Sequence, residues 1–311
     1  MDSSFSRDGV IDWLLGSLSL EASVFHAGRY CGAWQASTAG RLLGSFHLVL
    51  DGRCWLHRPG QAPLALGARD GVLFLRDVPH HLGPDADPRA HAAEPRASMV
   101  PLGTVGAGGT GLACGFFQFR GGVAGLLMDG LPDMVVLRAD EPGSERVATL
   151  FEFVQAEAGG DPDRPSPLLA RLVELLFFYA IRRIAARGTG PAGLWALARA
   201  PEMAPLLEGL LDRPGQAWSV EQMAAHVHMS RSNFCRRFGE LCGQSPAAFL
   251  TVLRMHVAAQ RLESGESIER AADHVGYRSS AAFSRAFKKA TGAQPGAWRR
   301  GGRQAGARVL Q

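Results

Sequence analysis

The segments SNFCRRFGELCGQSP at 232–246 and AAFSRAFKKATGAQP at 281–295 decide the fold of the C-terminal third of this chain. Phe, Arg, Phe, Gly and Pro recur in them at the same relative positions, with a constant shift of 49 residues. A repeated unit of this kind indicates one helical module that is used twice. Each unit has the order helix, turn, helix, and a serine stands where each helix should begin. The serines expected to cap these helices are Ser219, Ser230, Ser267 and Ser279.

The turns between the helices also have sequence signals. Gln222 follows Ser219 by three residues, as in a capping box, and predicts a helix over about 220–226. His228 and Met229 are expected to turn the chain in the first unit, and Gly276 in the second. The units are therefore predicted at about 219–241 and 267–290. The pair Ser245-Pro246 predicts a long connecting helix over about 246–263, because proline is favoured at the first helical position.

Polar and basic residues occupy the side of each second helix that lies opposite the paired phenylalanines. Phe234 and Phe238, like Phe283 and Phe287, are four residues apart and should face the core. The residues expected on the outer face are Ser230, Arg231, Ser232, Cys235 and Arg236, and in the second unit Ser279, Ser280, Ala281, Ala282, Ser284, Arg285, Lys288 and Lys289. Such a helix fits the major groove of DNA, where Arg can pair with guanine in a bidentate manner. Ser, Lys and helix N-terminal amides suit phosphates, which set register without reading sequence.

The distribution of charge agrees with a polyanionic partner for the C-terminal part alone. Residues 214–311 hold 14 Lys and Arg against 6 Asp and Glu, whereas the first 213 residues hold 19 against 23. Charge by itself leaves RNA, DNA and anionic lipid open. A solvated helix surface is the alternative for any single basic face, and the repeat argues against it.

The N-terminal region has a different pattern. Short apolar runs such as FHLVL at 46–50 and GVLFL at 71–75 alternate with turn signals, which predicts a small β-barrel or sandwich over about 20–130. Residues 144–187 become helical, and the stretch at 168–188 is apolar around most of its circumference. That helix is expected to pack on its own barrel and on a second copy of the protein, or else to be a buried linker in a monomer.

At this point the residues resemble a known family. SVEQMAAHVHMSRSNFCRRFGELCGQSPAAFL, RMHVAAQRL and SIERAADHVGYRSSAAFSRAFKKATGAQPGAWRR are similar to the DNA-binding domain of the AraC/XylS transcription regulators. FHLVLDGRCWL, DGVLFL with the following HHL, and LACGFFQF resemble the cupin-type sensor domain of one branch of that family. The resemblance implies an α+β multidomain protein: a cupin-like β-barrel over 1–135, a helical linker or dimerisation region over 136–213, and an all-α double helix-turn-helix domain over 214–311.

The resemblance also implies a function and assigns the base-reading positions. They fall on Ser232, Cys235 and Arg236 in the first unit, and the positions in the second unit are Ala281, Ala282 and Arg285. The alanines offer only apolar contact, for instance with a thymine methyl, and they put the width of the recognised site in doubt. We expect a sequence-specific transcription regulator that reads two successive major grooves, about 34 Å apart, under the control of a signal at the N-terminal domain.

Many cupins are metalloenzymes, so the residues at the positions of their two metal-binding motifs indicate whether this barrel holds a metal. Ser45 stands where the family's first motif has Glu, and residues 38–41 contain no His; only His80 or His81 matches the second motif. If Asp51-Gly52 is a two-residue hairpin turn, His47 pairs with Leu56 and His57 with Phe46, so the two imidazoles point to opposite faces. We therefore expect no metal, no cofactor and no enzyme. The residues predicted to line an effector pocket, with ordinary barrel core as the alternative, are His47, Trp55, Phe74, His81 and Cys114.

The remaining expectations concern partners and location. Besides promoter DNA, we expect a homodimer, RNA polymerase as a partner if the protein is an activator, and a small molecule or an oxidant as effector. Cys31, Cys54 and Cys114 permit redox sensing, and the odd total of five cysteines favours free thiols. No leader or membrane span is evident, which predicts a cytoplasmic protein. The alternatives are a cupin-type metalloenzyme fused to a basic module and a sequence-neutral architectural DNA-binding protein.

Overall fold

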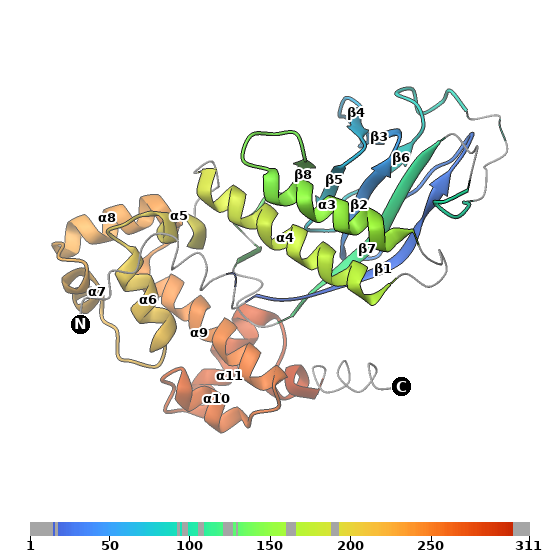
Figure 1. Ribbon diagram of the computed structural model, residues 1–311. Helices are drawn as coiled ribbons and strands as arrows, with labels where there is room; N and C mark the ends of the chain where they lie inside the picture. Colours follow the sequence, from blue (N-terminus) through green and yellow to red (C-terminus); the bar gives the residue numbers. More distant parts are fainter. Residues whose placement is uncertain are drawn as a thin grey trace. The chain divides into compact units, whose positions relative to one another are not determined.

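The computed structural model describes residues 15, 18–91, 94, 99–104, 109–120, 127–128, 130–159, 166–187 and 193–300. The chain divides into two compact units, one formed by residues 20–118 with 132–183 and the other by residues 1–19, 119–131 and 184–311. Figure 1 shows the first as strands with two helices and the second as helices. The helices of the predicted linker region divide between them, because α3 (Glu145–Ala158) and most of α4 (Pro167–Arg187) belong to the unit with the strands. Among the described helices, none has the length and apolar character needed to cross a membrane.

The strands of the first unit form two antiparallel sheets. Strands β1, β7, β2, β5 and β8 are neighbours in one sheet, in that order, and β4, β3 and β6 form the other. Apolar side chains from both sheets, such as Val49, Leu56, Val72 and Leu82, are fully buried in one core between them. This confirms the predicted cupin-like β-domain built from short strands. The strand bounds are β1 Ser19–Tyr30, β2 Gly44–Asp51, β3 Arg53–His57, β4 Leu64–Gly67, β5 Asp70–Phe74, β6 His81–Gly83, β7 Thr110–Arg120 and β8 Met134–Arg138.

The predicted hairpin at Asp51-Gly52 is wrong. Strand β2 pairs with β5 and β7, while β3 pairs with β4 and β6, so the turn carries the chain from one sheet to the other. His47 lies opposite Cys114 and Val72 instead of Leu56, and His57 lies opposite His81 instead of Phe46. Gly52 has φ +78°, and a Cβ there would collide with the carbonyl oxygen of Gly109. A tight Gly turn between apolar strands fits a crossover between sheets as well as a hairpin.

Helices α3 (Glu145–Ala158) and α4 (Pro167–Arg187) lie side by side across the five-stranded sheet (Figure 1). Phe177 of α4 packs on Phe117 of β7 with ring centroids 5.3 Å apart. A Glu174 carboxylate oxygen on α4 accepts a hydrogen bond from the backbone N–H of Ala22 at 3.0 Å. The predicted helix at 168–188 is therefore confirmed, and its buried stripe faces the sheet. Leu168 and Leu175, on the same helix, are about half exposed, at 57% and 47%.

The second unit is made of helices: the bounds of seven are described, and residues 295–300 are helical as well. The two that precede the repeat are α5 (Leu194–Arg199) and α6 (Ala204–Asp212). The first repeat gives α7 (Val220–His226) and α8 (Arg231–Cys242), α9 (Pro246–Glu263) connects the repeats, and the second gives α10 (Ile268–His274) and α11 (Ser280–Thr291). All four predicted serines cap these helices with their side-chain oxygens, and Ser219 and Gln222 form the expected capping box.

The turn of each repeat is held in a left-handed backbone conformation. His228 has φ +54° in the first repeat and Gly276 has φ +80° in the second, so the chain turns at the positions that the sequence predicted. The phenylalanine pairs Phe234/Phe238 and Phe283/Phe287 are buried, which confirms their assignment to the cores. Each second helix therefore presents its opposite side to solvent.

A close backbone contact joins the two repeats. Gly215 lies between α6 and α7, and its carbonyl oxygen would stand 2.6 Å from a Cβ placed on Gly276. Arg254 of α9 fixes the same segment, because its Nε donates to the carbonyl of Pro214 and its Nη2 to that of Gln216, both at 2.7 Å. Burial lowers the pKa of this guanidinium, yet both of its bonds run to backbone carbonyls. The segment before α7 is thereby attached to both α9 and the second turn.

We expect Gly276→Ala to destabilise the second unit more than Gly292→Ala. Both glycines have φ near +80°, so each alanine incurs a cost of about 1–2 kcal/mol for a left-handed residue. Only Gly276 is also in close contact with another backbone, and overpacking adds about 1–3 kcal/mol; a Cβ on Gly292 meets nothing within 4 Å. Chemical denaturation of both variants measures the difference. Equal losses of unfolding free energy would show that the Gly215–Gly276 contact is unimportant.

Candidate functional site

The outer faces of α8 and α11 form the first candidate site. Every predicted DNA-contacting residue of the two helices is exposed or half-buried, while the phenylalanines on the opposite side are buried. Ser232, Arg236, Ala281 and Arg285 are exposed, and Cys235 and Ala282 are half-buried. The fold therefore brings the predicted base-reading residues of each repeat to one accessible helix surface.

The arginines of α8 are held in place by neighbouring side chains. Arg236 donates through Nη1 to Glu240 at 2.7 Å and through Nη2 to Asn233 at 2.9 Å. Arg231 pairs with Glu221 of α7 at 3.0 Å. All of these groups are largely exposed, so each pair contributes little to stability. Their effect is on geometry, because a guanidinium held on two sides loses less side-chain entropy when it pairs with a base.

Helix α11 presents a freer basic surface. Arg285, Lys288 and Lys289 are exposed, and none of them forms an ion pair with another described residue. Three unpaired cations on one face attract phosphates more strongly than arginines already paired with carboxylates. The two helices thus differ in chemistry: α8 carries an arginine that contacts two neighbouring side chains, and α11 carries exposed cations without an ion pair among the described residues, beside two alanines.

The capping serines serve a structural role at both helix starts. Ser230 Oγ accepts from the backbone N–H of Asn233 at 3.4 Å, and Ser279 Oγ accepts from that of Ala282 at 3.3 Å. Each hydroxyl keeps its own hydrogen, which can donate to a phosphate oxygen. The helix N-terminus beside it adds a favourable dipole for an anion. Contact with phosphate remains a prediction for both serines.

A buried polar cluster lies inside the β-unit. Strand β2 contributes Ser45 and His47, β7 contributes Cys114, and the segments before β2 and β6 contribute Thr38 and His80. His47 Nε2 is 2.9 Å from His80 Nε2, and its Nδ1 is 3.0 Å from Cys114 Sγ. Thr38 Oγ1 is 3.2 Å from both Nε2 atoms and donates to Ser45 Oγ at 2.7 Å.

The hydrogen bonds of this cluster fix which atoms carry protons. His80 Nδ1 lies 2.6 Å from the carbonyl oxygen of Val78 and must donate to it, so its Nε2 is an acceptor. His47 then donates from Nε2 to His80 and accepts at Nδ1 from the Cys114 thiol. Burial, with His80 close by, lowers the pKa of His47 to about 3, and burial also lowers the pKa of His80. Both imidazoles are neutral near pH 7, and every member of the chain has a partner.

These residues do not fit a metal of the kind that cupins hold. The donor atoms that converge are two neutral imidazoles and a hydroxyl, with Ser45 where the family motif has a carboxylate. Among the described residues, no three or more His, Cys, Asp or Glu side chains are arranged to hold a metal ion. A buried divalent cation without an anionic ligand has a large desolvation cost.

The predicted effector residues separate into two places. His47, Phe74 and Cys114 lie together in the core, where Phe74 stacks on His80 with centroids 3.8 Å apart. His81 lies on the other face of β6 and lines a separate cavity of about 110 Å³. Trp55 is half-buried on β3 and lies two residues from His57, so both side chains are on the same face of the strand. Their register partners on β6 are Gly83 and His81. The pocket that the sequence suggested is thus not one contiguous surface, and effector binding by these residues remains a prediction.

The three thiols proposed for redox sensing differ in burial. Cys54 and Cys114 are buried, and Cys31 is half-buried. Burial raises the pKa of Cys54 to about 12 and that of Cys114 further, so both are protonated near pH 7. The thiolate is the reactive form, which makes both groups slow towards oxidants in this state. Redox sensing remains untested.

Sequence reasoning missed three features of these sites. The contacts of Asn233 and Glu240 with Arg236 could have been found from their spacing of three and four residues on one helix. The cluster around His47 had no sequence signal, because His80 and Cys114 are 33 and 67 residues away. The cavity beside His81 depends on β3 pairing with β6, for which the sequence contained no local signal.

Two protein-family models match this chain. A model described as Cupin matches residues 10–186, more than half of the chain. A model described as Helix-turn-helix domain matches residues 223–301, which contain most of the repeat.

Curated relatives match over almost the whole length. An uncharacterised HTH-type transcriptional regulator of Haemophilus influenzae is 28% identical over 279 residues, covering 86% of this chain and 91% of its own. A putative AraC-like transcription regulator of Streptomyces antibioticus is 29% identical over 287 residues, covering 90% and 93%. Among solved structures, the DNA-binding domain of AdpA in complex with a target DNA is 32% identical, with a TM-score of 0.32, and covers 33% of this chain and 93% of that one.

The neutral state of His47 predicts a dependence of stability on pH. The unfolded imidazole takes up a proton as pH falls through about 6.5, whereas the folded one stays neutral down to about 3. Unfolding free energy should therefore fall with decreasing pH, by up to about 1.4 kcal/mol per unit from this residue alone. Denaturation of the parent and of His47→Leu at pH 7 and pH 5 measures the slope, which should be shallower in the variant. His91→Gln is the opposite-sign control, because Glu94 raises the pKa of His91 and its removal should not make the slope shallower. An unchanged slope in His47→Leu would contradict the assignment.

Proposed function

Since this chain belongs to the AraC-type transcriptional regulators with an N-terminal cupin domain, we propose that α8 and α11 read its promoter DNA in two successive major grooves. The observation that carries the proposal is the exposure of both outer helix faces over buried phenylalanine pairs. A cupin domain without a fitting metal site then serves as sensor and not as catalyst. A DNA-binding regulator works beside the chromosome, so we place the protein in the cytoplasm.

The two reading helices have different tasks in this proposal. In α8, Arg236 pairs with guanine, with Ser232 and Cys235 beside it, and its contacts with Asn233 and Glu240 orient the guanidinium. In α11, Arg285 is the main reading residue, Ala281 and Ala282 contact thymine methyls, and Lys288 and Lys289 bind phosphates. Arg231, Ser230, Ser279 and Ser280 add phosphate contacts at the two helix starts. Sequence selectivity is therefore greater at the half of the site that contacts α8.

A sequence-neutral architectural protein is the second candidate, because α11 has few side chains that distinguish bases. In that case the alanines and the free cations of α11 would dominate, and affinity would depend on phosphates alone. The guanidinium of Arg236, fixed on two sides, favours specific recognition instead. A metalloenzyme is disfavoured by the neutral, fully hydrogen-bonded cluster around His47.

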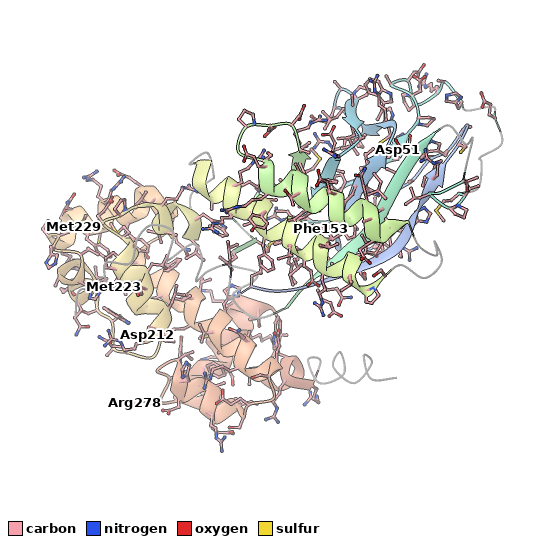
Figure 2. The ribbon with its side chains drawn as sticks, in the orientation of Figure 1. Asp51, Phe153, Asp212, Met223, Met229 and Arg278 are labelled. Atoms are coloured by element: carbon pink, nitrogen blue, oxygen red, sulfur yellow. The ribbon has the colours of Figure 1, made fainter. Side chains whose placement is uncertain are left out.

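We also propose that the protein is a homodimer through the outer face of α3 and α4. Phe153 of α3, labelled in Figure 2, is 56% exposed, and Leu168 and Leu175 of α4 are exposed to a similar degree. Large apolar side chains on neighbouring helices are typical of a contact surface. A two-fold symmetric pair of such faces would bury all six side chains at once.

The DNA proposal predicts different outcomes for reading and phosphate-binding residues. Arg236→Ala and Arg285→Ala should each weaken the preferred site by about 1–3 kcal/mol and relax base preference at one position. Lys288→Ala should weaken all sequences alike and lower the slope of log affinity against log salt by about one. Selection from randomised duplexes by the full chain, followed by titration at several salt concentrations, measures both. Uniform losses on every sequence in all three variants would establish the sequence-neutral alternative.

The dimer proposal predicts that a charge on the α3–α4 face separates the protomers. Phe153→Glu and Leu175→Glu should each shift the sedimentation of the full chain from dimer to monomer. Leu42→Glu, which changes a 91%-exposed leucine on another segment, should leave it unchanged. A parent protein that sediments as a monomer at micromolar concentration, or a dimer insensitive to both substitutions, would exclude this interface.

A further inference from the structure

A cavity of about 110 Å³ opens on the three-stranded sheet, on the face opposite the core. Leu56 and Leu82 are register partners on β3 and β6 and are buried in the core cluster. Side chains alternate along a strand, so the next partners, His57 and His81, point the other way and form the cavity floor. Their rings stack with centroids 4.7 Å apart and planes inclined by 14°. His57 is nevertheless 94% buried, and the residues that line the cavity with it come from the segment around Trp34, from Pro84 to His91, and from Glu94.

The cavity is lined by hydrogen-bond acceptors and negative charge. His57 Nε2 donates to the carbonyl oxygen of Asp85 at 3.0 Å, which leaves Nδ1 as the acceptor of this ring. Three carboxylates, those of Asp85, Asp87 and Glu94, stand around the opening, and no Lys or Arg is among the described residues that line it. Such a set of groups favours a ligand that is positively charged and donates hydrogen bonds.

The carboxylates are positioned by their own loop. Asp85 Oδ1 accepts from the backbone N–H of Asp87, and Asp87 Oδ1 accepts from that of Arg89, both at 2.9 Å. Glu94 is 3.0 Å from His91 Nδ1, and this contact raises the pKa of His91. These bonds hold the three acidic side chains at the rim before any ligand is present, which lowers the entropic cost of binding.

Size and chemistry restrict the ligand further. A cavity of about 150 Å³ is known to hold a six-carbon ring, so this one takes about five or six non-hydrogen atoms. A metal ion is the other cationic option, but the His, Asp and Glu side chains described here do not form a metal-holding group. Trp34 and the two prolines give the cavity apolar walls, which suit a short carbon chain.

We propose that this cavity is the effector site of the cupin domain and that its ligand is a small organic cation, an alkylammonium or guanidinium compound. The inference rests on the proposed function, since it supplies the signal that controls promoter binding. The cationic group lies among the carboxylates at the rim, and the short carbon chain lies against the imidazole floor.

Calorimetry on the full chain tests the site without DNA, with n-butylammonium as the probe and butyrate and zinc(II) as comparisons. We expect n-butylammonium to bind and the two comparison ions not to bind. A triple variant removes the charge of the loop and keeps its oxygen acceptors: Asp85→Asn, Asp87→Asn and Glu94→Gln. Each exposed charge is expected to contribute roughly threefold to affinity, so the triple variant should bind the amine at least about tenfold more weakly. Binding of butyrate or zinc in place of the amine, or an unchanged affinity in the triple variant, would overturn the proposal.

A second variant fills the cavity itself. Gly83 lines the cavity, and its backbone φ lies outside the left-handed region, so other residues are tolerated there. A Cβ at this position would have one neighbour, the carbonyl oxygen of Trp34, at the van der Waals contact distance of 3.7 Å. Gly83→Val should therefore fold and abolish amine binding. The matched control is Gly67→Val, at another glycine of the same sheet whose Cβ has a single neighbour, also at 3.7 Å. Amine binding that survives in Gly83→Val would place the ligand elsewhere and reject the cavity.

The effector role is tested by promoter affinity at a fixed amine concentration. Addition of the amine should change the affinity of the parent for the selected duplex and leave that of Gly83→Val unchanged. Because the amine screens the DNA charge equally for both proteins, a difference between them reports binding at the cavity. Equal responses would overturn the effector role. Failure of the parent to select any duplex sequence would instead overturn the proposed function, and the calorimetric result would stand apart from it.

Discussion

The two-repeat unit depends on the close contact between the backbones of Gly215 and Gly276. A side chain at Gly276 would collide with the carbonyl of Gly215, so the segment before α7 and the turn before α11 can meet only as bare backbone. Arg254 holds the same segment from α9 through two carbonyls. A double helix-turn-helix protein reads two grooves at one spacing only if its helices cannot move independently. The contact and the guanidinium together supply that rigidity.

The repeats could be predicted closely because their signals are local. A serine that caps a helix bonds to an N–H three residues later, and a left-handed turn favours glycine wherever it occurs. For this reason the starts of α7, α8, α9 and α11 were found from single residues. Even His228, which lacks the freedom of glycine, occupies the expected turn position because the helices on both sides fix it.

The sequence predicted that the N-terminal region forms a β-domain, but it did not predict which strands pair, because strand partners are distant in sequence. Asp51-Gly52 has the composition of a hairpin turn, and nothing nearby reveals that Arg53 will pair with Gly67 and not with Leu50. That error also gave His57 the partner Phe46, where the structure has His81. The exposure of the predicted DNA-contacting residues did not depend on strand pairing, because each set lies on one helix or at its N-cap, and their contact with DNA stays a prediction.

His80 and His81 are consecutive, and they connect the two polar features of the β-unit. His80 closes the neutral hydrogen-bonded chain that runs to Cys114, whereas His81, the first residue of β6, forms part of the cavity floor. The chain allows only one proton arrangement, since the Val78 carbonyl fixes His80 and His80 fixes His47. A shift of β6 by even a few tenths of an ångström lengthens these bonds, and buried polar groups tolerate such lengthening poorly. In the proposed complex the carbon chain of the ligand lies against His81, directly beside the residue that closes the hydrogen-bonded chain of the core.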